Sequence, residues 1–434
     1  MSSWRAAVTL VLGLAAAACL LFVPGLQASR GAAIAVVCLG LWLLELVPTF
    51  VPTLLLLAVT PVALGEGFTM REVLGWSADP VLLLFFGGFV FGEAARAHGI
   101  DRRLAANAVG AARGNARALV ALFALSTAFM SMWMSNIAAA ALMIAALRPM
   151  PDLDERVRRA LLLAVAFGAN LGGMATPIGS GPNAIAIAAM PAAHPVTFVV
   201  WMAFAVPLTL CSLAIAVALV IVRHGVRGAV PVSVPSATAD GHRPLVVAGI
   251  GLVAVIAWLS EPLHGVGAPT VALGLAVVLF GTGLVPAERL RRLDWGTLVL
   301  IAGGLALGHL LEETGILALL APHLATPGAS PLVFLGVLLT ASALLAAVMS
   351  NTATATLLIP LAMAARPGDP TLPILVALAS SFGMPFVVST PPNAMVAGEG
   401  VSSADLLVPG MVLLVGGVAA LTLTGGAVLD WFVG

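Results

Sequence analysis

Apolar residues run along this chain in long stretches, interrupted by arginine, proline, glycine and acidic residues. Residues 160 to 222 contain no Asp, Glu, Lys or Arg, and neither do residues 314 to 365. One helix needs roughly 20 apolar residues to cross a bilayer, so each stretch must hold more than one membrane segment. The pattern therefore predicts an all-α polytopic membrane protein.

The segments between these interruptions predict about eleven transmembrane helices. The first could also be a signal peptide, but its length and the spans behind it favour a transmembrane helix. The spans are expected near residues 6–25, 31–48, 51–66, 79–96, 160–180, 197–222, 244–260, 268–286, 295–311, 371–397 and 405–429.

Two further apolar stretches, residues 118–147 and 329–365, each carry a Ser-Asn pair near the middle. If the first stretch crossed the bilayer, the arginines before and after it would lie on opposite sides, against the positive-inside rule. A re-entrant hairpin of two half-length helices, turning at Ser135 and Asn136, keeps them together. Each stretch is therefore predicted to be such a hairpin, with its tip in protein or a water-filled cavity.

The arginines also predict the orientation of the chain. With a cytoplasmic N-terminus, 16 of the 19 basic residues face the cytoplasm, and only Arg30, Arg71 and Arg366 lie outside. The C-terminus would then lie outside. A composition rich in Ala, Gly and Arg and free of lysine suggests a high-GC bacterial source, and hence the inner, or plasma, membrane.

The two halves of the chain repeat the same motifs in the same order, 210 to 216 residues apart. Each copy holds five spans and one hairpin, and an odd number of spans makes the copies inverted across the membrane. Inverted repeats with broken helices are typical of secondary transporters that bind substrate near the midplane. The predicted divisions are an N-terminal helix over 1–29, a first repeat over 30–222, a cytoplasmic linker over 223–243 and a second repeat over 244–434.

Four polar clusters lie inside these apolar segments: SMWMSNIAAAA, MSNTATATLLIP, TPIGSGPNA and VVSTPPNA. Gly and Pro break the last two, which frees backbone groups that must be satisfied locally. Asn amides and free carbonyls can ligate a monovalent cation, while the N-termini of half-helices favour an anion. Polar residues in membrane helices often only bind neighbouring helices, but four clusters at matched positions favour a binding site.

Composition and charge narrow the function further. The chain is 61% hydrophobic and 9% charged, with a mean hydropathy of +1.12 and zero formal net charge. This hydrophobicity excludes a soluble protein. The sequence also contains no basic patch that could bind nucleic acid. The three cysteines lie in apolar segments without metal-ligand or disulfide spacing. No charged residue falls within the four clusters, so a multiply charged anion would need co-bound cations, which favours sodium symport.

Ionisable residues that could relay protons are few. Glu93, Glu312, Glu313 and His309 are interpreted as interfacial or packing residues, and Glu45 is the strongest exception. An intramembrane enzyme is not predicted, because no His or carboxylate lies near the cluster serines in sequence and no HExxH motif occurs.

The MSN and MSNT motifs, followed by GSGPN and STPPN, resemble those of the divalent anion:sodium symporter family within the ion transporter superfamily. The segment from Leu41 to Val62 is similar to that family's early helix containing Glu and Pro, and the resemblance covers about residues 30 to 430. It implies a homodimeric elevator-type carrier of C4-dicarboxylates such as succinate, malate or fumarate, or of sulfate in some members.

The resemblance also implies roles for ten residues. The first sodium site would use Ser131, Ser135, Asn136 and Gly179. The second would use Asn351 and Ser389, with Ser350 nearby. Residues at or beside the carboxylates of the substrate would be Ser135, Asn136, Ser180, Ser350, Asn351, Thr352 and Thr390.

Three positions depart from the family pattern. Ile137 replaces a threonine, which removes one hydroxyl and about 1 to 3 kcal/mol of hydrogen bonding from the substrate site. Ala346 stands where repeat symmetry with Ser131 would place a hydroxyl of the second sodium site. Gly181 replaces the first proline of Pro-Pro-Asn, so a looser break is expected beside Gly179.

The sequence therefore predicts sodium-coupled symport of a small divalent anion by alternating access. Sodium and the anion are the expected small partners, in a homodimer within the lipid bilayer and without an organic cofactor. Proton-coupled transport or anion exchange on the same fold remains the alternative.

Overall fold

The computed structural model describes residues 3–44, 46–148, 150, 153–190, 196–230, 242–324 and 330–433. Within these ranges all regular structure is helical, apart from one isolated bridge between Asn115 and Ala229. This confirms the predicted all-α class. Glu45 and most of the predicted linker, residues 231–241, lie outside the described residues.

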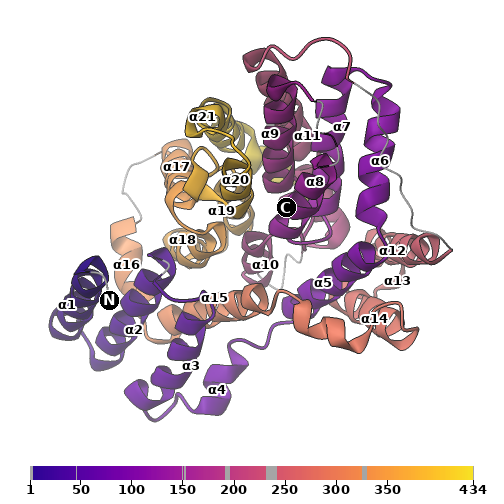
Figure 1. Ribbon diagram of the computed structural model, residues 1–434. Helices are drawn as coiled ribbons and strands as arrows, with labels where there is room; N and C mark the ends of the chain where they lie inside the picture. The colour runs from indigo at the N-terminus through magenta and orange to yellow at the C-terminus, as the bar shows by residue number, and fades with distance from the viewer. Residues whose placement is uncertain are drawn as a thin grey trace.

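The helices of the first half follow each other as Figure 1 labels them. They are α1 (Ser3–Phe22), α2 (Leu26–Leu43), α3 (Val51–Leu64), α4 (Met70–Gly75), α5 (Val81–Ala97), α6 (Ile100–Ala112), α7 (Ala116–Ser131), α8 (Asn136–Leu147), α9 (Glu155–Gly172), α10 (Gly181–Ala188) and α11 (Phe198–Arg223).

The second half adds two short 3-10 helices, η1 and η2, and a π-helical turn, η3. The elements are α12 (Arg243–Leu259), α13 (Glu261–His264), α14 (Ala268–Gly281), η1 (Ala287–Arg292), α15 (Trp295–Glu313), α16 (Ile316–Leu324), α17 (Pro331–Val348), α18 (Asn351–Ala365), α19 (Thr371–Ser381), η2 (Val387–Ser389), α20 (Pro391–Gly398), α21 (Ser403–Ala420), η3 (Leu421–Gly425) and α22 (Gly426–Val433).

Every predicted span contains a helix, but some boundaries differ from the expectation. The span predicted over 160–180 is interrupted, because α9 ends at Gly172 and α10 begins at Gly181. Helix α6 was not predicted, because Arg102 and Arg103 in its first turn interrupt the apolar pattern. Helix α16 was also not predicted, because residues 314 to 365 contain no Asp, Glu, Lys or Arg that would mark where one helix ends and the next begins.

Five of the described helices are long and apolar enough to cross a membrane by length and composition alone. A bent pair, Val81–Ala97 with Arg102–Ala112, raises this number to six if it forms one span. Several predicted spans contain helices that are shorter than the 18 residues this criterion requires, such as α3 and α14 with 14 residues each. The number of eleven spans therefore stays a prediction.

The helices form three packed groups. One hydrophobic cluster joins α7, α8, α9 and α11 to α17, α18, α19 and α21, and we call this group the central body. A second cluster holds α5, α12 and α14, and a third holds α2, α3 and α15; these are the two flanks. Figure 1 shows α2 and α3 at the lower left of the central body and α5, α12 and α14 at its lower right, with α15 running from one flank toward the other.

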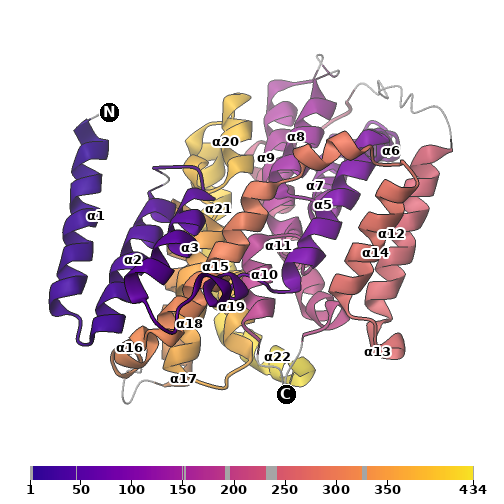
Figure 2. The same cartoon turned by 90° about the horizontal axis from the view of Figure 1, so that it is seen from below.

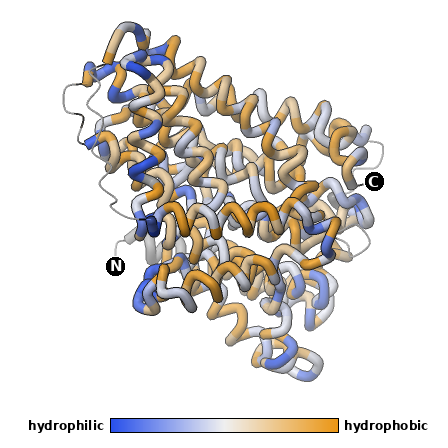
Figure 3. The backbone as a smooth tube through the Cα atoms, turned by 90° about the vertical axis from the view of Figure 1, so that its right-hand side faces the viewer, coloured by the Kyte–Doolittle hydropathy of each residue, from blue (hydrophilic) through white to orange (hydrophobic). Residues whose placement is uncertain are grey.

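Hydropathy follows the same arrangement. Figure 3 shows apolar colouring along most of the helices, with hydrophilic residues gathered mainly near helix ends and in the connections. Many large apolar side chains, among them Leu245, Val253 and Val415, are at least 60% exposed on helix surfaces. Helices that expose apolar faces in this way suit a lipid environment.

Candidate functional site

The first hairpin consists of α7 and α8, which meet at a short turn. Met150, just after α8, lines a small pocket with Asn115 and Leu119 at the start of α7. The chain thus returns to the end where it entered. At the tip, Ser135 is the N-cap of α8, and its Oγ accepts a hydrogen bond from the Ala138 N–H at 3.3 Å.

The second hairpin consists of α17 and α18 and folds back in the same way. The guanidinium of Arg366, just after α18, lies over the ring of Phe334 in the first turn of α17, 4.3 Å from its centroid. The tip is formed by Met349 and Ser350, and Ser350 is the N-cap of α18. Figure 2 places α8 and α17 toward opposite edges of the molecule.

Each break that follows a hairpin is held by one buried asparagine. Asn183 donates from Nδ2 to the carbonyl oxygens of Gly173 at 3.0 Å and Thr176 at 2.7 Å. Asn393 donates in the same way to Met384 at 3.0 Å and Phe386 at 2.8 Å. Both side chains are fully buried, so each satisfies carbonyls that the break would otherwise leave unpaired.

The broken helices cross between the two halves of the chain. Helix α10 packs against α18 and α19, and α20 packs against α8 and α9. Nδ2 of Asn170 in α9 donates to Oδ1 of Asn393 in α20 at 3.0 Å. The hairpin of one half is therefore completed by the break of the other.

The hairpin tips and breaks surround one cavity of about 520 Å³. Ser131 does not line it but lies directly behind, fully buried, with its Oγ 2.7 Å from the carbonyl oxygen of Ala169. The structure thus brings the predicted residues together although they are up to 259 positions apart. Those that line the cavity are Ser135, Asn136, Gly179, Ser180, Ser350, Asn351, Thr352, Ser389 and Thr390.

Four helix N-termini face this cavity, those of α8, α10, α18 and α20. Their N-caps Ser135, Ser180, Ser350 and Thr390 all line it. A helix N-terminus carries about half a positive charge and free N–H groups, so the cavity can attract an anion without a basic side chain. Of the described residues that line it, only Asp294 carries a charge.

Oxygen atoms gather beside the first tip. The Asn136 side-chain oxygen lies 2.7 Å from Ser131 Oγ and 3.3 Å from the carbonyl oxygens of Ala169 and Gly179. If the amide were turned over, its Nδ2 would donate to the same three oxygens. With the oxygen inward, Asn136 Oδ1 would join the Ser131 hydroxyl and the two carbonyl oxygens in a set of oxygen ligands of the type that sodium uses.

The second tip has a related but unequal arrangement. The buried Oδ1 of Asn351 has no hydrogen-bond partner among the described residues. Ser389 Oγ donates to the carbonyl oxygen of Ala347 at 2.6 Å. Ala346 is fully buried and supplies no hydroxyl. The hydroxyl beside the second tip therefore comes from Ser389 in the break. The hydroxyl beside the first tip, in contrast, comes from Ser131 in its own hairpin.

Two other departures from the family pattern are also located. Ile137 lines the cavity and is 47% exposed, so an apolar surface stands where the family has a hydroxyl. Gly181 was expected to loosen its break, but a Cβ there would lie 2.3 Å from Thr352 Oγ1. The glycine instead permits the close approach of α10 to α18.

The described residues considered as proton carriers, Glu93, His309, Glu312 and Glu313, do not line this cavity. Glu93 is buried and pairs with Arg289 at 2.6 Å and Arg96 at 2.5 Å, which makes it a structural ion pair. His309 stacks on Trp76 with ring centroids 6.3 Å apart and lines a separate cavity together with Glu312.

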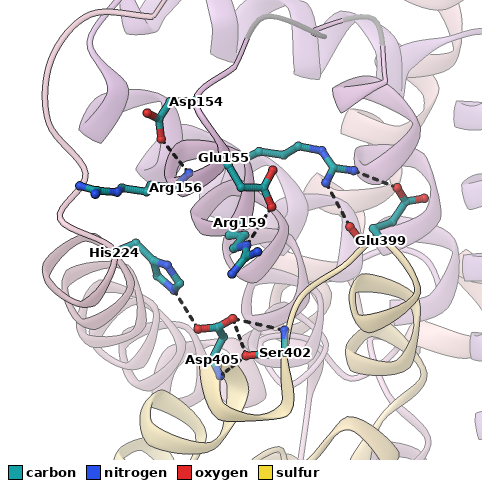
Figure 4. Close-up of polar contacts among 9 residues, drawn as sticks. Asp154, Glu155, Arg156, Arg159, His224, Glu399, Ser402 and Asp405 are labelled. Atoms are coloured by element: carbon teal, nitrogen blue, oxygen red, sulfur yellow. Dashed lines mark hydrogen bonds and ion pairs between the residues drawn. The ribbon is translucent and has the colours of Figure 1, made fainter.

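A charged network joins the two halves at the end of the molecule where α9 begins (Figure 4). Arg158 donates to the backbone oxygen of Glu399 at 3.1 Å and contacts its carboxylate at 3.3 Å. His224 Nε2 lies 3.8 Å from Asp405, which also forms a capping box with Ser402. Burial lowers the pKa of His224, and Asp405 partly opposes this shift.

Sequence reasoning missed several residues that line the cavity. Asn170 is 4% exposed and its Oδ1 has no partner among the described residues. An asparagine in the uncharged stretch AFGANLGG is a signal that could have identified it. Asp294, Thr297 and Thr49 follow polar or proline-containing segments, so their sequence context marks them only as helix-end residues.

Comparisons with known proteins identify related transporters. A family model described as "Citrate transporter" matches residues 39–380. An uncharacterized transporter of Haemophilus influenzae is 30% identical over 416 residues, which cover 89% of each chain. The sodium-dependent dicarboxylate transporter SdcS of Staphylococcus saprophyticus is 27% identical over 433 residues, which cover 88% of this chain and 82% of that one.

A solved structure shares the fold. The crystal structure of the Alcanivorax borkumensis YdaH transporter aligns with a TM-score of 0.61 at 16% sequence identity, covering 89% of this chain and 99% of that one. Together with the sequence matches, this confirms the predicted family resemblance and a transporter rather than an enzyme. Since the family model spans most of the chain, this multi-pass membrane protein belongs to the citrate transporter family.

Proposed function

We propose that the protein is a sodium-coupled symporter of a small divalent anion. The substrate class is a C4-dicarboxylate such as succinate, malate or fumarate, or sulfate. One relative is named a sodium-dependent dicarboxylate transporter, and the cavity chemistry supports the same activity here.

The observation that carries this proposal is the convergence of four helix N-termini on one cavity without a basic side chain among its described lining residues. The partial positive charges suit the carboxylates of a dicarboxylate or the oxygens of sulfate. They do not neutralise a dianion completely in a low-dielectric site. Co-bound cations would supply the remaining charge, which favours symport over transport of the anion alone.

The oxygen clusters beside the two tips support sodium as that cation. Asn136, Ser131 and Gly179 would hold one ion, and Asn351 with Ser389 would hold a second. Both clusters adjoin residues assigned to the substrate. Sodium binding would therefore order the tips and strengthen the anion site, which is the physical basis of coupling.

For alternating access, we propose an elevator-type movement of the central body against the two flanks. Both hairpins and both breaks belong to one hydrophobic cluster. An ion pair between Arg158 and Glu399 also joins the two halves of the chain, which supports movement of the central body as a unit. The matched asparagine contacts support two inverted repeats, residues 30–222 and 244–434. The proposal includes a homodimer in the bacterial inner membrane, with a cytoplasmic N-terminus.

Uptake of labelled succinate into proteoliposomes tests this function. An inward sodium gradient is compared with potassium, lithium and proton gradients, and sulfate and other dicarboxylates serve as competitors. Concentrative uptake that requires sodium is expected. Uptake that requires preloaded anion would indicate an exchanger, and uptake driven by protons alone would replace sodium as the coupling ion.

The site assignment is tested by Asn136→Ala. Loss of sodium-stimulated uptake is expected, because both the anion site and the first cation site lose the amide. The matched control is Asn107→Ala, because Asn107 is exposed on α6 and does not line the cavity. Unchanged sodium stimulation in Asn136→Ala would rule out this cation site.

A further inference from the structure

The cavity has two walls of different character. The hairpin tips and breaks form one wall, with uncharged N-caps at four helix ends. The opposite wall comes from the flanks and includes Thr49, Asp294, Gly296 and Thr297. Asp294 precedes α15, a helix of 19 residues, so a fifth helix N-terminus also faces the cavity.

Asp294 caps this fifth N-terminus with a full negative charge. Its Oδ1 accepts from the Thr297 N–H at 3.0 Å, and its Oδ2 accepts from the Thr297 hydroxyl at 2.7 Å. The described residues place no basic group within ion-pair distance of the carboxylate. The helix contributes only about half a positive charge, so the flank wall is negative overall.

A negative wall in an anion-binding cavity requires a physical explanation. Without the carboxylate, the free N–H groups of Gly296 and Thr297 would offer the anion a second binding surface on the flank. An anion held by both walls would link the central body to the flank and oppose their relative movement.

We propose that Asp294 is a positioning residue that keeps the anion on the hairpin wall. Its charge weakens anion binding to the flank, sets the preference among anions of different charge, and permits the loaded central body to move. This role rests on the proposed transport function. It acts through repulsion, so its effect increases with the charge of the anion.

Asp294→Asn is the decisive variant, because asparagine caps a helix as well as aspartate does but carries no charge. Even at the dielectric constant of water, removal of one charge roughly 10 Å from a dianion should lower the KM for succinate by at least about fourfold. Citrate carries one more negative charge at pH 7.5, so its inhibition constant should fall by at least about eightfold on the same reasoning. The kcat for succinate should fall, because without the repulsion the anion is held more strongly near the flank.

Two matched variants separate charge from capping. Asp294→Glu keeps the charge and should keep a KM close to wild type. Asp154→Asn replaces another capping aspartate, at the start of α9, whose Oδ1 accepts from Arg156 N–H at 2.7 Å outside the cavity. It should leave uptake unchanged.

Binding of succinate and citrate to the purified protein is measured beside uptake. A lower KM with a lower kcat in Asp294→Asn, together with the larger effect on citrate, would support the proposed role. Unchanged or weaker binding in this variant, with normal wild-type uptake, would overturn it while leaving the transport function intact. Wild-type protein that neither binds nor transports these anions would overturn both.

Discussion

Replacement of Gly181 by alanine tests how closely the two halves of the chain approach each other at the cavity. Gly181 is the first residue of α10 and is buried. A Cβ at this position would lie 2.3 Å from Thr352 Oγ1, 2.8 Å from its Cγ2 and 3.1 Å from its Cβ. Thr352 is buried and branched at Cβ, so it has little freedom to turn away.

The expected cost follows from overpacking. Relief requires a shift of α10 against α18, or an unfavourable rotamer of Thr352, and such changes cost about 1 to 3 kcal/mol. The melting temperature of Gly181→Ala should therefore fall. Because Thr352 belongs to the proposed anion site, the KM for succinate should also rise.

A double-mutant cycle assigns this effect to one contact. Thr352→Ala removes the two nearest atoms, so the double variant Gly181→Ala with Thr352→Ala should be more stable than the two separate losses predict. The control is Gly249→Ala in α12, where a Cβ would meet no atom within 4 Å. It should be neutral or stabilising by about 1 kcal/mol. If Gly181→Ala melts and transports like this control, the close approach of α10 to α18 is refuted.

Three other variants test separate parts of the site. Asn393→Ala removes two hydrogen bonds to carbonyls of its own break and one from Asn170, so thermal unfolding should show a loss of about 2 to 4 kcal/mol; wild-type stability would contradict this. Ser389→Ala should raise the sodium concentration for half-maximal uptake and also lower the melting temperature, because the Ala347 carbonyl and the Phe386 N–H lose their partner; an unchanged sodium requirement would exclude Ser389 from the second cation cluster. Burial holds the pKa of His224 below its ordinary 6.5. The unfolded chain therefore binds a proton at this residue more readily than the folded chain does. As a result, the free energy of unfolding should decrease as pH falls from about 7 through the folded pKa. His224→Gln should flatten melting temperature against pH between 7 and 5, and an identical pH profile would show that other groups cause the loss.

Much of the helical framework could be predicted because it depends on local chemistry. Helix pairs over Ala116–Leu147 and Pro331–Ala365 occupy the stretches 118–147 and 329–365, where apolar length and arginine position favoured a turn, while their re-entrant course in a membrane stays a prediction. The prediction failed at α6. This segment is too polar to be recognised from its apolar pattern, and tertiary packing stabilises it as a helix.

The sequence itself determined the membrane class and the polar motifs that interrupt its apolar segments, because apolar length and helix-breaking residues act within short segments. Only the tertiary structure decided how these segments meet: that Asn170 contacts Asn393, that Gly181 admits Thr352, and that Asp294 closes the opposite wall. These contacts join residues more than a hundred positions apart. Local pattern carries no information about such distances, which the packing of the whole bundle fixes.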